Sequence, residues 1–345
     1  GQRYDTAGVA VGDEFRINTY TSRYQQDASM TTLDNGSLVV TWESGYHWST
    51  QDGSGYGIYG KVFDADGLVA GPEFQVHTST SGHQYDPSVT ALDGGGFVVA
   101  WQDEGRSSKI YGQMYGEDGM RMDGEFLISD STSNYHPEVA RLDGGGFVVT
   151  WQNTNSYDGG SGTDIRGQVF NSDGTEVGDE FRANTYTEAS QTEADVTSLT
   201  GANSGRFIVT WTSSGQDGGG TGVYAQMYDN TGAAVGDEFR ISTETKGNQE
   251  DASVTALTDG GFFVTWESNG QDGSGAGIYG QRFDVNGMPV KFTSSLDVSE
   301  ITGSTLEAVR LFGDIEAGDS YTLSVDGGTT YTATYTALSF LNFTV

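Results

Sequence analysis

The 345-residue sequence has no cysteine, only four prolines, few basic residues and no long apolar run. The lack of cysteine excludes disulfides, thiolate metal sites and a cysteine nucleophile. Sixteen lysines and arginines face 48 aspartates and glutamates, giving a formal net charge of −32. This excess of negative charge argues against nucleic acid as a partner. No stretch approaches the roughly 18 apolar residues of a membrane span, so membrane insertion is not expected.

Glycine is abundant, with 52 residues, and it accompanies a repeat. A strand ending in tryptophan recurs at intervals of about 50–60 residues, in forms such as GFVVTW and RFIVTW. These register tryptophans are Trp42, Trp101, Trp151, Trp211 and Trp266. Five copies of one unit, separated by glycine and aspartate turns, are typical of radial sheets or solenoids.

Each copy contains three further strand-like segments. The one after the tryptophan strand resembles GIYGQRF, the next contains Glu-Phe, and the last resembles DASVTAL. Apolar residues occur on both faces of the tryptophan strand and of the GIYGQRF-like segment, so both faces should be covered. The small residue inside the GIYGQRF-like segment is expected to admit a neighbouring tryptophan. The sequence therefore predicts an all-β, five-bladed β-propeller of four-stranded repeats over residues 1–295, with buried register tryptophans.

The two ends of the repeat region look complementary. Residues 11–21 read as an intact outermost strand, whereas the corresponding part of the fifth copy, 288–295, is degraded. We expect 11–21 to add the outermost strand to the fifth blade and close the ring. The alternatives are an open superhelical stack and a fifth blade completed by 290–292. Residues 296–345 alternate apolar and polar residues and are expected to form a small or truncated β-rich module.

Acidic residues recur at two places that propeller geometry brings to one rim. Asp27, Asp86, Glu193 and Asp251 stand at the entrance to the innermost strands, with His136 in the third copy, and Glu43 and Glu267 follow tryptophans. Glycine-rich loops add Asp52, Asp158, Asp217 and Asp272. These carboxylates suggest Ca²⁺ ligands. The alternative is that each one caps its own turn. No organic cofactor is expected.

The first copy has an aromatic insertion, SGYHWSTQDGSGYG, over residues 44–57. Tyr46, Trp48 and Tyr56 lie within it, and sugars stack on exposed aromatic faces. A lectin-like, carbohydrate-binding propeller is therefore one alternative for function. The other explanation is that the loop folds its aromatic side chains onto its own blade.

The phrase GGFFVTWESNGQDGSGAGIYGQRFDVNG (260–287) resembles repeats of large secreted RTX-type, haemolysin-type calcium-binding surface proteins and adhesins. These occur in Gram-negative bacteria and cyanobacteria. The resemblance implies an extracellular or cell-surface scaffold or adhesion module whose partners are other surface modules or glycans. The tandem nonapeptide GGxGxDxUx of that family does not occur here, so the resemblance places no calcium ligand on any residue.

An enzyme is the third class to weigh, because five-bladed propellers include glycosidases that use two unlike carboxylates. The acidic residues here recur at equivalent positions, which fits a role in the repeat better than a role in one reaction. No GxSxG or HExxH motif occurs. The sequence thus favours a non-enzymatic protein without catalytic residues, with a propeller glycosidase as a remote alternative.

Overall fold

The computed structural model describes residues 1–45, 51, 53, 55–154, 162–290, 320–325 and 329–334. Within these residues the chain is all-β: it contains five four-stranded antiparallel sheets, two short hairpins and no α-helix. Two single turns of 3-10 helix, η1 (Glu104–Arg106) and η2 (Gly201–Asn203), interrupt the strands.

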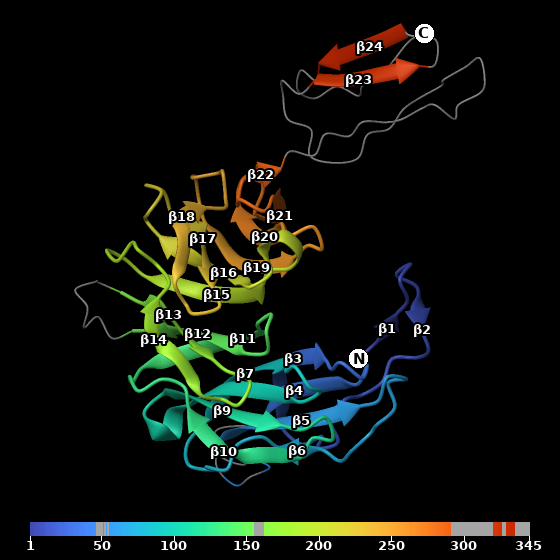
Figure 1. The fold of residues 1–345 in the computed structure, drawn as a ribbon, viewed down its shortest axis with the longest axis vertical. Helices are drawn as coiled ribbons and strands as arrows, with labels where there is room; N and C mark the ends of the chain where they lie inside the picture. The colour runs from blue at the N-terminus through green and yellow to red at the C-terminus, as the bar shows by residue number, and fades with distance from the viewer. Residues whose placement is uncertain are drawn as a thin grey trace. The chain divides into compact units, whose positions relative to one another are not determined.

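The five sheets follow one another along the chain, and each repeats the order of the previous one (Figure 1). The first consists of β3 (Tyr24–Thr32), β4 (Leu38–Gly45), β5 (Tyr56–Phe63) and β6 (Phe74–Gln75). The second consists of β7 (Gln84–Ala91), β8 (Phe97–Asp103), β9 (Lys109–Tyr115) and β10 (Arg121–Leu127). The third consists of β11 (Asn134–Arg141), β12 (Phe147–Asn153), β13 (Asp164–Phe170) and β14 (Glu176–Arg182). The fourth consists of β15 (Gln191–Ser198), β16 (Arg206–Ser214), β17 (Thr221–Asp229) and β18 (Ala234–Arg240). The fifth consists of β19 (Gln249–Ala256), β20 (Phe262–Asn269), β21 (Ala276–Phe283) and β22 (Pro289–Val290).

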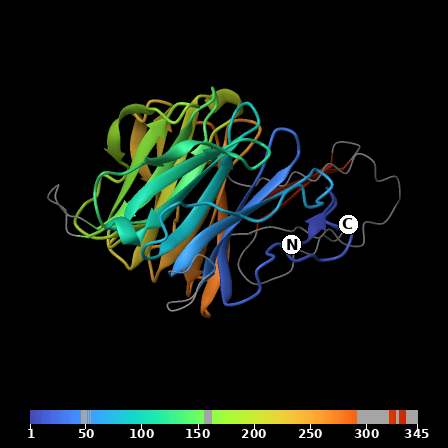
Figure 2. The same ribbon diagram turned by 90° about the horizontal axis from the view of Figure 1, so that it is seen from below.

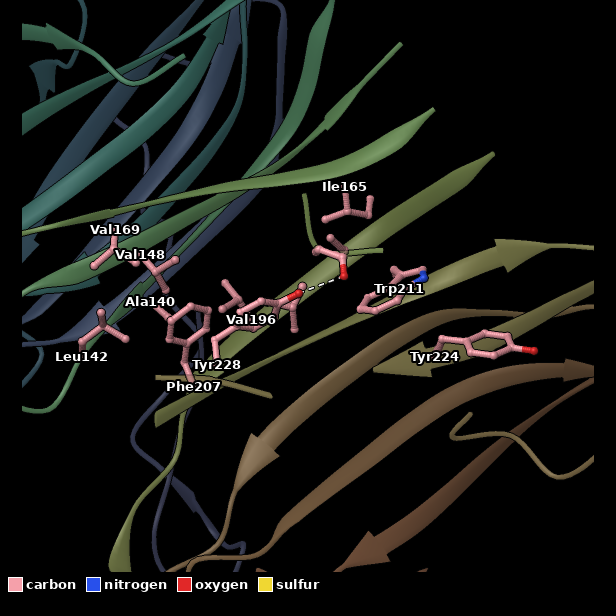
Figure 3. Close-up of a cluster of buried hydrophobic side chains, with 13 residues drawn as sticks. Ala140, Leu142, Val148, Ile165, Val169, Val196, Phe207, Trp211, Tyr224 and Tyr228 are labelled. Carbon is pink, nitrogen blue, oxygen red and sulfur yellow. Dashed lines mark hydrogen bonds between the residues drawn. The ribbon is translucent and has the colours of Figure 1, made fainter. Parts of the chain in front are cut away.

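Consecutive sheets lie face to face in a propeller-like arrangement (Figure 2). Their first strands pack in the series β3, β7, β11, β15 and β19, and no comparable packing joins β19 to β3. The apolar core lies between the sheets. One such cluster joins Ile165 and Val169 of the third sheet to Trp211 and Tyr228 of the fourth (Figure 3). The Tyr228 hydroxyl donates to the carbonyl oxygen of Ala183 at 2.8 Å across this interface.

The glycine in the third strand of each of the first three sheets has a different neighbour from the one predicted. A Cβ atom added at Gly60 would lie 2.6 Å from the Phe74 ring, which belongs to the outermost strand of the same sheet. Gly112 and Gly167 are covered in the same way by Phe126 and Phe181. Four register tryptophans, Trp101, Trp151, Trp211 and Trp266, are buried between sheets, and Trp42 is buried beside the N-terminal segment. The glycine therefore makes room for a phenylalanine of its own sheet and not for a tryptophan of the next one.

The N-terminal segment also differs from the predicted closing strand. β2 (Ala10–Val11) pairs with β1 (Arg3–Tyr4) in a hairpin, and β22 is the fourth strand of the fifth sheet. Phe15 and Ile17 pack against the first sheet, beside Trp42. The physical reason is that residues 1–4 already supply a strand partner for the segment. In the structure the fifth sheet is therefore completed by β22 at residue 290, as in the alternative with 290–292, and not by residues 11–21.

The chain divides into two compact units, residues 1–289 and 290–345. In the second unit the described residues form one antiparallel pair, β23 (Ser320–Val325) with β24 (Thr329–Thr334). No helix of the described residues is long and apolar enough to cross a membrane.

Candidate functional site

The first strand of every sheet contains a β-bulge whose central residue has left-handed backbone geometry. The φ angles are 48° at Asp27, 52° at Asp86, 50° at His136, 54° at Glu193 and 54° at Asp251. Each residue falls within the register shift between its strand and the tryptophan strand. Positive φ strains a residue other than glycine, and such strain gathers at functional sites. These are the five entrance positions recognised in the sequence, so the repeat holds them in one unusual conformation.

Glu43, at the end of the tryptophan strand of the first sheet, is buried and 1% exposed. One carboxyl oxygen accepts from the backbone N–H of Asp86 at 2.7 Å, and the other accepts from Gln26 Nε2 at 3.1 Å. Burial, helped by the nearby charges of Asp86 and Asp27, raises the pKa of Glu43 to about 7. This carboxyl group therefore keeps its proton to a higher pH than an exposed glutamate does.

Asp86 links the second sheet to the third. Its Oδ2 lies 3.0 Å from His136 Nδ1, and this hydrogen bond raises the pKa of His136. Two residues further along the same strand, Glu138 accepts from the Ser88 hydroxyl at 2.8 Å. Burial, with the charge of Asp195 next in importance, raises the pKa of Glu138 to about 7. We call Glu43, Asp86, His136 and Glu138 the rim cluster.

The acidic series continues into the fourth and fifth sheets. Glu193 accepts from the Thr212 hydroxyl at 2.8 Å and from the backbone N–H of Asp251 at 3.2 Å. Burial and the charge of Glu193 raise the pKa of both Asp251 and Glu250. Neighbouring inner strands therefore bring acidic side chains from all five sheets into one electrostatically coupled row.

Three aromatic rings stand next to the rim cluster. The ring centroids of His83 and Tyr85 are 5.2 Å apart and nearly parallel, and Tyr56 lies 5.6 Å from Tyr85 and 5.7 Å from His83. Burial, with the charges of Glu104 and Glu43 behind it, raises the pKa of Tyr85 to about 12. Tyr56, His83 and Tyr85 are called the aromatic trio.

Of the three rings, only Tyr56 was among the predicted glycan-binding residues, and its side chain is only 9% exposed, so its glycan binding stays a prediction; His83 and Tyr85 were not singled out. Tyr85 directly precedes Asp86, and among the five copies only the second and third have tyrosine at this position. This difference from the other copies was the feature by which Tyr85 could have been recognised in the sequence. Tyr46 and Trp48, the other two predicted glycan-binding residues, lie outside the described residues.

The remaining predicted metal ligands make mainly local contacts. Asp27 accepts from Gln26 Nε2 at 2.9 Å. Asp217 and Asp272 each accept a backbone N–H two residues ahead, at 3.0 Å, as turn caps do. Glu267 pairs across the strands with Glu250, while Asp52 and Asp158 lie outside the described residues. In the described ranges no three His, Asp or Glu side chains form a group that could hold a metal ion, and Ca²⁺ binding stays a prediction.

Neither family models nor curated proteins match this sequence. Similarity appears among solved structures. A protein of unknown function from Dyadobacter fermentans has a TM-score of 0.50 at 11% identity, with 89% of this chain and 93% of that one covered. This likeness concerns the fold. An ulvan lyase, a polysaccharide lyase, matches with a TM-score of 0.49 at 11% identity, covering 78% and 69%. An α-L-arabinofuranosidase from Fusarium graminearum matches with a TM-score of 0.47 at 13% identity, covering 75% and 82%.

Two interpretations of the sequence are corrected by these comparisons. The chain was predicted to be a non-enzymatic scaffold or adhesion module, but the similar structures include enzymes named for polysaccharides and glycosides. At such low identity they assign no activity to this chain. The structure gives the physical reason for the correction. The recurring acidic residues were treated as equivalent, whereas Glu43 is buried and Glu267, the other glutamate at this repeat position, is only partly buried.

Proposed function

We propose that this chain is a carbohydrate-active protein whose five sheets act as five propeller blades and whose rim cluster and aromatic trio bind a glycan. The observation that carries the proposal is that Tyr85 of the trio directly precedes Asp86 of the cluster. A sugar presents an apolar face of C–H groups, which stacks on aromatic rings, and a set of hydroxyls, which donate to carboxylates. The juxtaposition supplies both kinds of contact from one short stretch of β7.

The charge of the site favours a neutral glycan. Asp86, Glu138 and Glu193 lie along the same row, and the chain as a whole has a net charge of −32. A sulfate or carboxylate on the sugar would meet this negative potential at a cost in affinity and association rate. Neutral oligosaccharides are therefore the expected ligands, and sulfated or uronic-acid sugars are disfavoured.

The experiment is a glycan array with neutral and acidic oligosaccharides, followed by calorimetry on those that bind. Asp86→Asn removes the carboxylate and keeps a residue type that tolerates positive φ. Asp251→Asn is the matched control, because Asp251 has the same repeat position and a φ of 54° but belongs to the fifth sheet. We expect Asp86→Asn to weaken binding by at least about tenfold, as the loss of a hydrogen bond to a charged group does. Equal affinities of the two variants, or no binding by the parent, would contradict the proposal.

Glycoside cleavage is a second candidate, favoured by the raised pKa of Glu43. Glycosidases need one carboxylic acid that is protonated near neutral pH and a second carboxylate. Glu43 and Asp86 are such a pair of unlike groups in contact through the Asp86 backbone. Release of reducing ends from a bound oligosaccharide, abolished by Glu43→Gln, supports this activity. If the parent protein binds the glycan but leaves it intact over days, cleavage is excluded and the binding function stands.

A further inference from the structure

The second sheet departs from the repeat in the connection between its second and third strands. In the other four sheets this connection contains a glycine-rich sequence: QDGSG (51–55), YDGGSG (157–162), QDGGG (216–220) and QDGSG (271–275). In the second sheet it is only EGRSS (104–108), and it contains the 3-10 turn η1. Ser107 and Ser108 have positive φ angles of 71° and 51°. Strain at residues other than glycine persists only where surrounding contacts fix the backbone, and it gathers at functional sites.

Three charged side chains fix this turn. Arg106 Nε donates to Asp103 Oδ2 at 2.6 Å, and Arg106 Nη2 donates to Glu125 Oε2 at 2.9 Å. The other oxygen of Asp103 accepts from the backbone N–H of Arg106 at 3.1 Å. Asp103 is fully buried, so another conformation of the turn would leave a buried charge without its partner. We call Asp103, Arg106 and Glu125 the ion triad.

The first and fourth sheets have different residues at the positions of the ion triad. A serine takes the place of Asp103 and a glutamine that of Arg106, while the glutamate is the same. The two sets are Ser44, Gln51 and Glu73, and Ser213, Gln216 and Glu238. In each set the glutamine accepts from the serine hydroxyl and donates to the glutamate. The second sheet thus has an ion pair in place of a serine and a glutamine, and it keeps the link to its outermost strand with a shorter connection.

The turn lies directly against the segment that leads into the aromatic trio. A Cβ atom added at Gly105 would lie 1.6 Å from the carbonyl oxygen of Ser81, and one added at Gly82 would lie 2.7 Å from Gly105 Cα. Neither position has room for a side chain. The backbone N–H of Glu104 donates to the carbonyl oxygen of His83 at 2.9 Å. This close packing places Glu104 beside His83.

His83 is held between the first two sheets. Its Nδ1 accepts from the backbone N–H of Tyr56 at 3.0 Å, so the hydrogen of the neutral ring is on Nε2. Nε2 lies 3.9 Å from Glu104 Oε2. The rings of His83 and Tyr85 are only partly buried, and the Glu104 side chain is 51% exposed. After burial, the charge of Glu104 is the largest cause of the raised pKa of Tyr85. Glu104 is therefore an accessible carboxylate next to both rings.

We propose that Glu104 is a further glycan-binding residue, whose carboxylate accepts from the hydroxyls of a sugar stacked on the aromatic trio, and that the ion triad positions it. This inference rests on the glycan-binding function proposed above. A sugar ring that stacks on an aromatic side chain through its C–H face directs hydroxyls outward from its edge. The two oxygens of one carboxylate can accept from two neighbouring hydroxyls. The ligands expected at Glu104 are therefore neutral sugars with two adjacent free hydroxyls.

Calorimetry with neutral xylo-, cello-, manno- and galacto-oligosaccharides tests the role of Glu104, and the tightest-binding of these sugars is the probe. Glu104→Gln should weaken its binding by at least about tenfold, as the loss of a hydrogen bond to a charged group does. Glu117→Gln is the matched control, because it removes the same charge from an exposed turn between β9 and β10 of the same sheet. Equal affinities of these two variants, with Asp86→Asn still weakened, would overturn this proposal alone. A parent protein that binds none of these sugars would overturn the glycan function and this inference together.

Singly deoxygenated versions of the probe identify the contact. Loss of a hydroxyl that donates to Glu104 should weaken binding to the parent and change the affinity of Glu104→Gln little. If each lost hydroxyl weakens binding to both proteins by the same factor, Glu104 contacts no hydroxyl and the proposal is wrong.

The positioning role of the ion triad is tested through its coupling to Glu104. Arg106→Gln introduces the residue type found in the first and fourth sheets and removes the charge that holds Asp103. It should weaken binding of the probe in the parent and do so clearly less in Glu104→Gln, because a positioning residue acts through Glu104. If Arg106→Gln does not fold, Asp103→Ser with Arg106→Gln takes its place, since this pair rebuilds the serine–glutamine–glutamate set and leaves no buried charge. The same factor in both backgrounds, or no change in either, would overturn the positioning role.

Discussion

Asp86 Oδ2 lies 3.0 Å from His136 Nδ1, so a hydrogen bond joins the central bulges of two neighbouring sheets. Both residues have left-handed φ angles, and both sit at the same repeat position. The pair belongs to no single sheet. It forms only when the second and third sheets pack.

The first prediction concerns the titration of His136. The hydrogen bond that His136 donates to the Asp86 carboxylate raises the pKa of His136 above the ordinary 6.5. This contact therefore stabilises the fold fully below pH 6.5, and the contribution is lost as the pH rises through the folded pKa. An NMR titration of the imidazole resonances should give His136 a pKa above 6.5 in the parent and a lower one in Asp86→Asn. Identical titration curves in the two proteins would rule out the contact.

The second prediction concerns Glu43 and the dependence of stability on pH. Its folded pKa is about 7 against an ordinary 4.5, so the native state holds the proton more tightly than the unfolded chain. The favourable contribution is complete below about pH 4.5 and disappears as the pH rises through 7. Relative to Glu43→Gln, the parent should lose about 2 kcal/mol of unfolding free energy between pH 5 and pH 8.

Urea denaturation at the two pH values measures this difference. Glu176→Gln is the control, because Glu176 is exposed on an outermost strand. The same pH dependence in Glu43→Gln as in the parent would show that Glu43 is not the group responsible.

The repeat and its strands could be predicted from the sequence because the tryptophan strand and the GIYGQRF-like segment recur in every copy at intervals of about 50–60 residues. Only part of the rim cluster could be predicted from the sequence. Asp86 and Glu43 stand out as recurring acidic positions, but the burial that raises the pKa of Glu43 depends on how the sheets pack. Tyr85 and His83 come together with Tyr56 only after the first two sheets are placed side by side. Completion of the fifth sheet by β22 was only one of several alternatives at the level of the sequence. The sequence does not reveal that residues 1–4 act as a strand partner for the N-terminal segment.

The third prediction concerns the core between the sheets. Trp151 is fully buried and packs with Ile110 and Phe170. Trp151→Ala should cost about 3–5 kcal/mol of unfolding free energy, the usual range for a large core aromatic residue. Met120→Ala, at an exposed position, should change stability by about 0.5 kcal/mol or less. Chemical denaturation of both variants checks the contrast, and similar losses would contradict the packing described.

The fourth prediction concerns the N-terminal segment. Phe15 and Ile17 cover the face of the first sheet beside Trp42. Deletion of residues 1–21 should expose this apolar face, lower the melting temperature and promote association, as uncovered faces and sheet edges do. Light scattering and thermal melts report both effects. A truncated protein that remains monomeric with the parent's melting temperature would mean that the segment does not cover the sheet.

The glycan site itself can be tested through the histidines, of which the chain has only four. His83 belongs to the aromatic trio and His136 to the rim cluster, whereas His77 is buried at 1% exposure and bonds to the Ser79 carbonyl. The most direct measurement is the imidazole NMR spectrum during titration with a neutral oligosaccharide that binds, with resonances assigned by single His→Gln variants. The account predicts saturable shifts of His83 and His136 with His77 unchanged. Saturable binding that leaves both His83 and His136 unmoved would contradict it.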